Sequence, residues 1–396
     1  MSPISSFQRP KGRTVRVLTS SELLQHLERR DSSGPLLGID LVVLEQLEQM
    51  DAAYELSVAL LRHATQSSPT RYLGLSHSLM DCTDVAAWLD IDPFAVSSFT
   101  PADRNQALNM NTQTFTIAFS ASLFKAMAKP THDAIQAAGP QESAIVFVPS
   151  RGQCRNIALD LITQCALSNE TDHGYLPADV SVDQLEVPLA RLQDRSLVDM
   201  ISGGIGVFHE GLTKSDRVLM LELFAEGVVR VLLVPHESSW SLPVRASVVV
   251  VMGTQYAQYS ADSERQIREY DMTEIVHMQS RALSQTRVGH FHLLCQAEAK
   301  DTIMRFLNGG LALESELLAA PAIRQWIARS RARGLDVTKQ TLLDVLSFTF
   351  LARRVVSNPV YYDCQPGNRS DVLSRLVDRI EEGTAPPVAQ GSATTS

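Results

Sequence analysis

Two neighbouring residues, His236 and Glu237, place a base beside an acid, the two groups that general acid–base catalysis uses. They follow Val228–Val234, an almost continuous run of β-branched residues and leucine that predicts a buried strand. Side chains of adjacent residues generally point apart, so we do not expect this pair to act on one substrate. A catalytic pair is the less favoured interpretation of the dipeptide.

A second stretch of chemical interest is rich in arginine around one tryptophan. Arginine beside an aromatic ring could hold a phosphate and stack a base. The same pattern is also that of one solvated helix face ending at Gly334, and this interpretation is favoured. The residues concerned are Arg324, Trp326, Arg329, Arg331 and Arg333.

The sequence contains no G-x-x-x-x-G-K-[ST] motif. That loop cradles nucleotide phosphates with backbone N–H groups and a lysine. The five cysteines are scattered without a C-x-x-C pair, which argues for reduced intracellular thiols and against zinc. We therefore predict neither a metal site nor a phosphate loop in this chain.

The composition sets the class of protein. The chain has 396 residues, of which 44% are hydrophobic and 20% charged, enough for two or three globular domains. It has no apolar run of about 18 residues and no secretory signal at its start, so we expect no membrane association. Because its net charge is −9, the chain is not expected to bind nucleic acid tightly. Local basic patches are still compatible with weak binding.

The elements that must position these residues are clearest between Gly203 and Tyr259. The run Ile205–Phe208 predicts a buried strand, and Thr213 stands where a helix N-cap belongs, with Asp216 three residues later. Ser247–Met252 predicts another buried strand. Buried strands that alternate with an amphipathic helix predict a parallel sheet with right-handed crossovers.

Similar patterns extend along the rest of the chain. Strands are predicted at Thr14–Thr19, Pro35–Val43, Tyr72–Ser76, Ala144–Val148 and His290–Cys295. Helices are predicted at Ser21–Arg30 and Ser370–Glu382, and a polar surface excursion at Asn169–Asp194.

In their order along the chain, the motifs resemble those of the Ski-like superfamily 2 RNA helicases. The resemblance runs from roughly Arg13 to Glu382 and is nearest to the degenerate C-terminal helicase cassette of the spliceosomal U5 members. It implies an α/β fold with RecA-like parallel sheets flanked by helices, followed by a small, mostly helical winged-helix domain. It also implies helices at Asp84–Leu89 and Asp344–Arg354. The residues that carry it include FHEGL at Phe208–Leu212, DVAAWL at Asp84–Leu89, VFVPSR ending at Arg151, and NPVYY at Asn358–Tyr362.

The resemblance also indicates what has changed at the ATP-binding positions. Active members carry D-E-x-H, with an aspartate on magnesium and a glutamate that polarises water. Here the aligned residues are Asp40 and then Leu41–Val43, so only the aspartate remains. Ser76 and Ser78 occupy the family's S-A-T turn, with a histidine between them.

The family's last motif, Q-x-x-G-R-x-G-R, aligns with His277–Ser284. Arg281 matches its first arginine, but Ser284 replaces the arginine finger, a loss worth on the order of 10³–10⁵ in rate. The resemblance thus implies that no catalytic set is intact. ATP and Mg²⁺, the cofactors of active relatives, are not expected here, and Asp40, Ser76, Ser78 and Arg281 are remnants.

On the RNA side, the resemblance implies contacts for Arg151, whose loop approaches the RNA backbone in relatives, and for His209 of FHEGL. Arg324, Arg329 and Arg331 are further candidates from the arginine-rich stretch. The loop Pro235–Pro243 is two residues shorter than the G-V-N-L-P loop of active members, so it cannot present the same backbone groups.

These patterns predict four regions. Residues 1–103 form the C-terminal half of a first RecA-like domain, 104–309 a second RecA-like domain, 310–383 a winged helix and 384–396 a disordered tail. A half-domain exposes a sheet edge, so either another chain completes it or it is marginally stable.

The expected function is that of a degenerate helicase module that binds protein or RNA instead of hydrolysing ATP. The expected partner is a protein of a ribonucleoprotein or splicing-type assembly in the nucleus, with weak RNA contact. Two alternatives stay open. The chain could be a fragment of an ATP-dependent RNA helicase whose missing motifs lie in a split or mispredicted gene, or a decaying duplicate without a selected function.

Overall fold

The chain forms two compact units in a computed structural model: Pro101–Gly309, and Met1–Thr100 together with Gly310–Ser396. The structure describes residues 12–28, 38–168, 174–177, 180, 185–259, 264–283, 288–319, 321–334 and 337–384. No helix in these ranges is long and apolar enough to cross a membrane.

The unit Pro101–Gly309 is built on a six-stranded sheet in the order β3-β10-β7-β4-β6-β5, in which all neighbouring strands are parallel. Its strands are β3 (Leu108–Phe115), β4 (Ala144–Val148), β5 (Ile205–Val207), β6 (Val231–Pro235), β7 (Val248–Met252) and β10 (Gly289–Gln296). Every residue of β4, β6 and β7 is buried, which explains why their sequences are continuous apolar runs. A separate antiparallel pair joins β8 (Gln255–Tyr259) to β9 (Arg265–Glu269).

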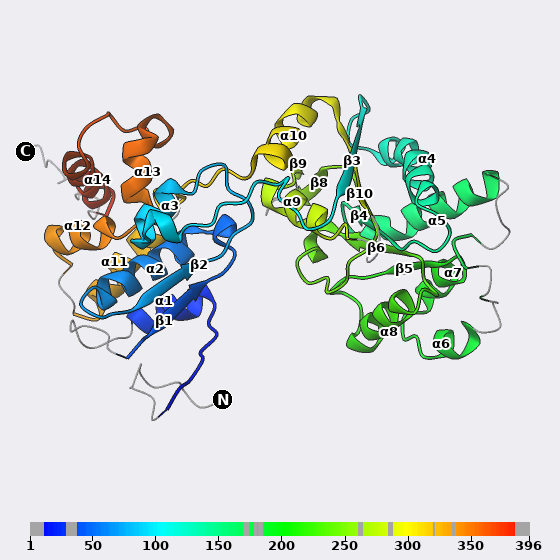
Figure 1. Cartoon of the computed structure of the whole chain (residues 1–396), viewed down its shortest axis with the longest axis horizontal. Helices are drawn as coiled ribbons and strands as arrows, with labels where there is room; N and C mark the ends of the chain where they lie inside the picture. The colour runs from blue at the N-terminus through cyan, green and yellow to red at the C-terminus, as the bar shows by residue number, and fades with distance from the viewer. Residues whose placement is uncertain are drawn as a thin grey trace, which may run out of the picture. The chain divides into compact units, whose positions relative to one another are not determined.

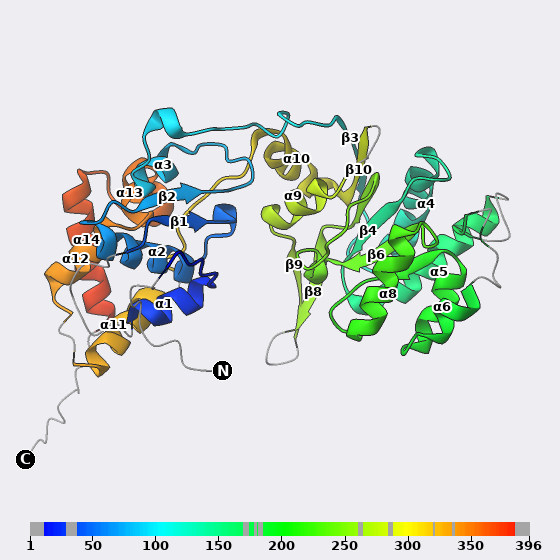
Figure 2. The same ribbon diagram turned by 60° about the horizontal axis from the view of Figure 1, so that its bottom comes forward.

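Helices flank this sheet. In both Figure 1 and Figure 2, α9 and α10 lie on the opposite side of the sheet from α4 and α5. The helices are α4 (Ala121–Ala137), α5 (Arg151–Leu167), α6 (Glu186–Ala190), α7 (Val198–Ser202), α8 (Lys214–Ala225), α9 (Met272–Ser280) and α10 (Lys300–Gly309), with short 3-10 turns η4 (Arg195–Leu197), η5 (His236–Ser238) and η6 (Ala297–Ala299). The predicted cap is confirmed, since Thr213 accepts a hydrogen bond from the backbone N–H of Asp216 at the start of α8.

The second unit contains a smaller sheet, formed by β1 (Leu41–Leu44) and the parallel strand β2 (Arg71–Gly74). Its helices come from both ends of the chain: α1 (Ser20–Glu28), α2 (Ala52–Thr65), α3 (Thr83–Leu89), α11 (Ala322–Ala332), α12 (Lys339–Ser347), α13 (Leu351–Ser357) and α14 (Arg369–Thr384), with η1 (Leu47–Gln49), η2 (Pro93–Ala95) and η7 (Pro359–Tyr362). Leu24 and Leu56 share one core with residues of α11–α14, so the two ends of the chain fold together.

The predicted fold class, parallel sheets flanked by helices followed by a helical region, is confirmed. The strand predicted at Thr14–Thr19 is wrong. These residues are irregular, and Val15 and Val17 are 92% and 91% exposed, because an alternating pattern makes no strand without a partner. The strand predicted from Pro35 begins at Leu41, with residues 29–37 outside the described ranges.

The helix predicted at Asp344–Arg354 is divided between α12 and α13. Within 310–384 the described residues form helices and turns, plus one bridge from Leu311 to Leu79, and the winged-helix assignment remains a prediction. Most of the predicted tail, from residue 385, and much of the Asn169–Asp194 excursion lie outside the described ranges.

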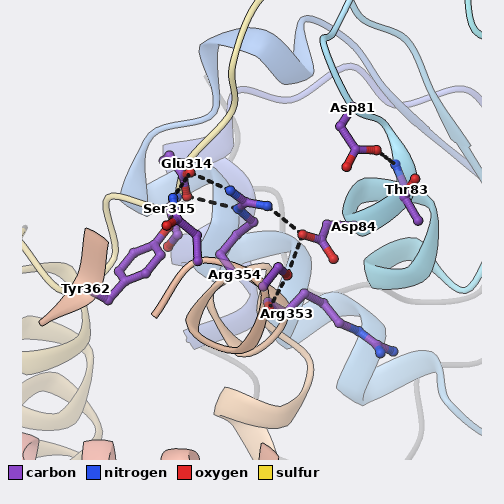
Figure 3. Close-up of polar contacts among 10 residues, drawn as sticks. Asp81, Thr83, Asp84, Glu314, Ser315, Arg353, Arg354 and Tyr362 are labelled. Carbon is purple, nitrogen blue, oxygen red and sulfur yellow. Dashed lines mark hydrogen bonds and ion pairs between the residues drawn. The ribbon is translucent and has the colours of Figure 1, made fainter. Parts of the chain in front are cut away.

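A polar network around Arg354 joins the early and late parts of this unit (Figure 3). The guanidinium donates to Oδ2 of Asp84 at 2.6 Å and, through Nε, to Oε2 of Glu314 at 2.9 Å. Tyr362 donates its hydroxyl to the same Glu314 oxygen at 2.8 Å. The network thus connects α3, the segment before α11, α13 and η7.

A second contact of this kind is made by Glu55, a fully buried carboxyl on α2. It accepts hydrogen bonds from the hydroxyl of Ser315 at 2.6 Å and from the N–H of Leu351 at 2.8 Å. Burial raises the pKa of Glu55 to about 7, above its ordinary value of 4.5. The carboxyl is therefore protonated in the folded chain at pH values where it is ionised in the unfolded one.

The first prediction concerns this proton. Between pH 4.5 and about 7 the unfolded chain releases a proton that the folded chain keeps, so the free energy of unfolding should fall as pH rises through this window and level off above it. Glu55→Gln keeps an acceptor for Leu351 and should remove most of this fall. Urea unfolding of both proteins at about pH 5 and about pH 8 measures it. The exposed Glu45→Gln is the control, and a fall of wild-type size in Glu55→Gln would contradict the assignment.

Candidate functional site

The carboxyl ends of the parallel strands in the unit Pro101–Gly309 carry several of the predicted residues. Arg151 follows β4, His209 follows β5, and His236 and Glu237 follow β6. Because β4, β6 and β5 are neighbours in the sheet, these loops lie side by side at one edge. This is the edge at which open α/β sheets bind ligands.

Arg151 and Glu237 form an ion pair with 3.1 Å between Nε and Oε1, and their side chains are 57% and 47% exposed. A Cβ on Gly211 would lie 2.5 Å from Nη1 of Arg151, so the glycine of FHEGL leaves room for the guanidinium. The pair is open to solvent, and an exposed pair contributes only about 0–1 kcal/mol. Arg151 is therefore available to an anion that can displace Glu237.

His209 is half-buried beside this pair. Burial lowers the pKa of its imidazole, and the nearby charge of Arg151 lowers it further. Within the described part of the chain, its Nδ1 atom has no hydrogen-bond partner. A neutral ring with a vacant nitrogen next to an arginine can hydrogen-bond a phosphate or a ribose hydroxyl.

His236 and Glu237 turn away from each other, as predicted. Nδ1 of His236 lies 3.5 Å from Glu274, and its ring stacks on Tyr270 at 4.7 Å between centroids. Glu237 instead pairs with Arg151. The dipeptide therefore forms no acid–base pair.

Arg281 lies at the C-cap of α9 and donates from Nη2 to Nε2 of His277 at 3.0 Å. The ring of His277 in turn stacks on Trp240, with 3.7 Å between centroids. Burial and the charge of Arg245 lower the pKa of the Arg281 guanidinium. Ser284, the residue aligned with the arginine finger, lies outside the described residues.

In the other unit, Asp40 precedes β1 and is exposed. It thus stands at the amino end of the strand, whereas Ser76 and Ser78 follow the carboxyl end of the parallel strand β2. The residues at the carboxyl end of β1 are the buried Leu44 and the exposed Glu45. The structure therefore does not bring Asp40 together with the serine turn.

The serine turn has a partner that the sequence interpretation missed. The buried Glu48 accepts hydrogen bonds from the hydroxyl of Ser76 at 3.0 Å and from the N–H of His77 at 3.1 Å. The hydroxyl of Ser78 donates to the carbonyl of Phe99 at 2.6 Å. In the sequence, Glu48 is visible as an acid four residues after the end of β1. Its spacing alone could not show that Ser76 and His77 donate to it.

The arginine-rich stretch forms α11, and its tryptophan is not available for stacking. Trp326 is 7% exposed and belongs to the core. Arg329 donates through Nη2 to the buried carboxylate of Glu28 at 2.7 Å, while Arg324 and Arg331 are exposed. The base-stacking alternative therefore fails, and Arg329 has a structural partner.

No group of three histidine, cysteine, aspartate or glutamate residues could hold a metal ion in the ranges that the structure describes.

Comparisons with known proteins identify homologues over most of the chain. It is 32% identical over 315 residues to the U5 small nuclear ribonucleoprotein 200 kDa helicase of Homo sapiens, which matches 78% of this chain and 14% of that protein. It is 28% identical over 381 residues to the RQC trigger complex helicase SLH1 of Saccharomyces cerevisiae, covering 92% of this chain and 19% of that protein. The pre-mRNA-splicing factor brr2 of Schizosaccharomyces pombe is 26% identical over 367 residues, with coverage of 89% and 16%. No family model matches the chain.

The second prediction tests the structural assignment of Arg329. Arg329→Ala removes the hydrogen-bonding partner of a buried carboxylate and should lower the free energy of unfolding by about 1–3 kcal/mol. The exposed Arg331→Ala on the same helix should change it by less than about 0.5 kcal/mol. Urea unfolding of the two variants makes the comparison, and equal effects would contradict the assignment.

Proposed function

This chain is a homologue of the Ski-like superfamily 2 RNA helicases over most of its length, and we propose that it is a helicase-like binding module that does not hydrolyse ATP on its own. The position of Asp40 carries the proposal. Four residues of β1 separate it from the ligand edge, about 13 Å along a strand. At that edge the strand ends in Leu44, which cannot ligate magnesium, so Glu45 has no metal-bound phosphate to act on.

The proposed partner is a protein of a ribonucleoprotein assembly. Two of the relatives are a helicase of the U5 small nuclear ribonucleoprotein and a pre-mRNA-splicing factor. A nuclear location and a role in splicing are parts of the same proposal. RNA contact would be secondary, because the net charge of the chain is −9.

A second candidate is a piece of an ATP-dependent RNA helicase. The chain spans less than a fifth of the length of the relatives described above, which favours this alternative. The ligand edge built from Arg151 and His209 is compatible with both. The two candidates differ in whether the missing phosphate loop is supplied by another sequence.

The third prediction separates chemistry from binding. The purified chain should show no saturable affinity for ATP by calorimetric titration and no RNA-stimulated phosphate release, because it has no phosphate loop. Arg281→Ala and Asp40→Ala should leave any trace release unchanged. The proposal would be wrong if RNA stimulated phosphate release by the wild-type chain and either substitution abolished that release.

The fourth prediction concerns RNA contact. Glu237→Gln frees Arg151 from its ion pair and should raise the affinity for single-stranded RNA up to about fivefold, the equivalent of an exposed ion pair. Arg151→Ala should lower the affinity relative to wild type. Fluorescence anisotropy with a labelled oligonucleotide at fixed salt measures both changes. The exposed Glu210→Gln, next to His209 but outside the pair, controls for the change in net charge; an equal rise in that variant would mean that Arg151 is not the contact.

A further inference from the structure

Two histidines of β10, His290 and His292, project from the same face of the larger sheet. Side chains alternate between the faces of a strand, so residues two positions apart lie on one face, about 6.6 Å from each other. Phe291 and Leu293, which project from the other face, are buried, whereas the two histidines are half-buried. An ion from solution can therefore reach both imidazoles.

The strand beside β10, the edge strand β3, adds two polar side chains to this face (Figure 1). Asn109 and Asn111 pair in register with His290 and His292, and both asparagines are exposed. On the other side of β10, the paired residues of β7 are two fully buried valines. Because neighbouring strands lie about 4.8 Å apart, the two imidazoles and the two amides form one polar block at the margin of the sheet.

The imidazoles of the polar block are available as ligands. Within the part of the chain that the structure describes, neither ring makes a hydrogen bond or an ion pair. Burial lowers the pKa of His292, and the nearby charge of His290 lowers it further, which agrees with two rings that lie close together. A neutral imidazole offers a nitrogen lone pair to a metal ion.

We propose that His290 and His292 together bind one divalent ion of the late first-row transition metals, such as Ni²⁺, Cu²⁺ or Zn²⁺. Asn109 and Asn111 are the oxygen donors beside it, and water fills the remaining positions. Metal–imidazole bonds of about 2.0–2.1 Å allow two histidines on one strand face to reach the same ion. Imidazole suits these metals, whereas Mg²⁺ and Ca²⁺ take oxygen ligands. The inference does not depend on the proposed function.

The chemistry of the polar block separates this site from its alternatives. The lack of a C-x-x-C pair argues against a zinc site built from cysteines, but it does not bear on a pair of histidines. A phosphate group of RNA is disfavoured as the ligand, because the block contains no lysine or arginine. A single histidine can also bind a metal ion adventitiously, and in that case only one of the two rings would matter.

Calorimetric titration of the purified chain with Ni²⁺ alone tests the site, because Ni²⁺ favours nitrogen ligands. His290→Gln and His292→Gln each remove one proposed ligand. The control, His26→Gln, removes a half-buried histidine of the other unit. Asn111→Asp places a carboxylate beside His292, and Asn156→Asp adds the same charge at an exposed position of α5.

We expect each substitution of His290 or His292 to weaken Ni²⁺ binding at least about tenfold, since changing a residue that only supports a metal ligand already costs about 10–100-fold. His26→Gln should bind Ni²⁺ as the wild-type chain does. Asn111→Asp should bind Ni²⁺ at least about fivefold more tightly than Asn156→Asp, which is the effect of one charge about 4 Å away in water.

Histidine NMR provides a test that requires no substitution in the measured chain. Ni²⁺ in an octahedral site is paramagnetic and broadens the signals of the rings that bind it. The ten histidines of the chain are labelled with carbon-13, and the variants assign the signals of His290 and His292. These two signals should broaden first, and together, as Ni²⁺ is added.

Three results would each overturn the proposal. Wild-type affinity for Ni²⁺ in either the His290 or the His292 variant would mean adventitious binding to one histidine. Earlier broadening of another histidine ring would place the ion elsewhere. Equal affinities of Asn111→Asp and Asn156→Asp would show that no ion lies beside β3.

Discussion

The guanidinium of Arg354 binds Glu314 and Asp84 at the same time, and all three side chains are largely withdrawn from solvent. The contact spans the sequence from α3 to α13, a separation of 270 residues. Loss of the arginine would leave two carboxylates close together without a counter-charge, which is far more costly than the loss of an exposed ion pair. The network therefore joins α3, α13 and the segment before α11 within one unit.

The sheet of that unit explains why the network matters. Parallel sheets are normally covered on both faces, and two strands alone are marginal in water. Trp88 on α3 donates its indole N–H to the carbonyl of Phe348 at 2.8 Å and packs against Phe350, which joins the helical region to the half-sheet. Helices from the C-terminal part of the chain thus provide the hydrophobic core that two strands cannot form alone. They do not cover the whole sheet, because Leu41, Val43, Leu73 and Leu75 remain 40–52% exposed.

Local patterns were enough to predict most of the larger sheet, but not its edge strand β3, whose residues are mostly exposed. The apolar runs of β4, β5, β6 and β7, together with the cap at Thr213, specify buried strands that alternate with helices. Parallel strands place their following loops at one edge, so Arg151, His209 and Glu237 could be assigned to the same edge, but their proximity depends on the strand order β4-β6-β5. What could not be predicted depends on contacts between distant residues. The partners Arg329 and Glu28 are 301 residues apart, and no spacing rule identifies them.

Asp40 illustrates a different limit. Matching motifs along the sequence aligned Asp40 with the metal-binding aspartate. Because β1 begins at Leu41, Asp40 lies before the strand and not at its carboxyl end. Tertiary packing sets that boundary, since Leu44 enters the core while Leu41 stays half exposed. Hydrophobic residues in one short run cannot show which end is buried.

The two units consequently differ in what their residues can do. At the edge of the larger sheet, Arg151 is held by a solvent-exposed pair that a phosphate can displace at little cost in free energy, so its guanidinium stays accessible to an anion. In the smaller unit, the serine turn is bound to the buried Glu48, and no carboxylate on β1 is placed to hold a metal ion beside it. A chain that keeps these contacts but lacks an assembled phosphoryl-transfer site can still bind a partner. Catalysis would require a strand, a phosphate loop and a metal ligand from outside the sheet that β1 and β2 form.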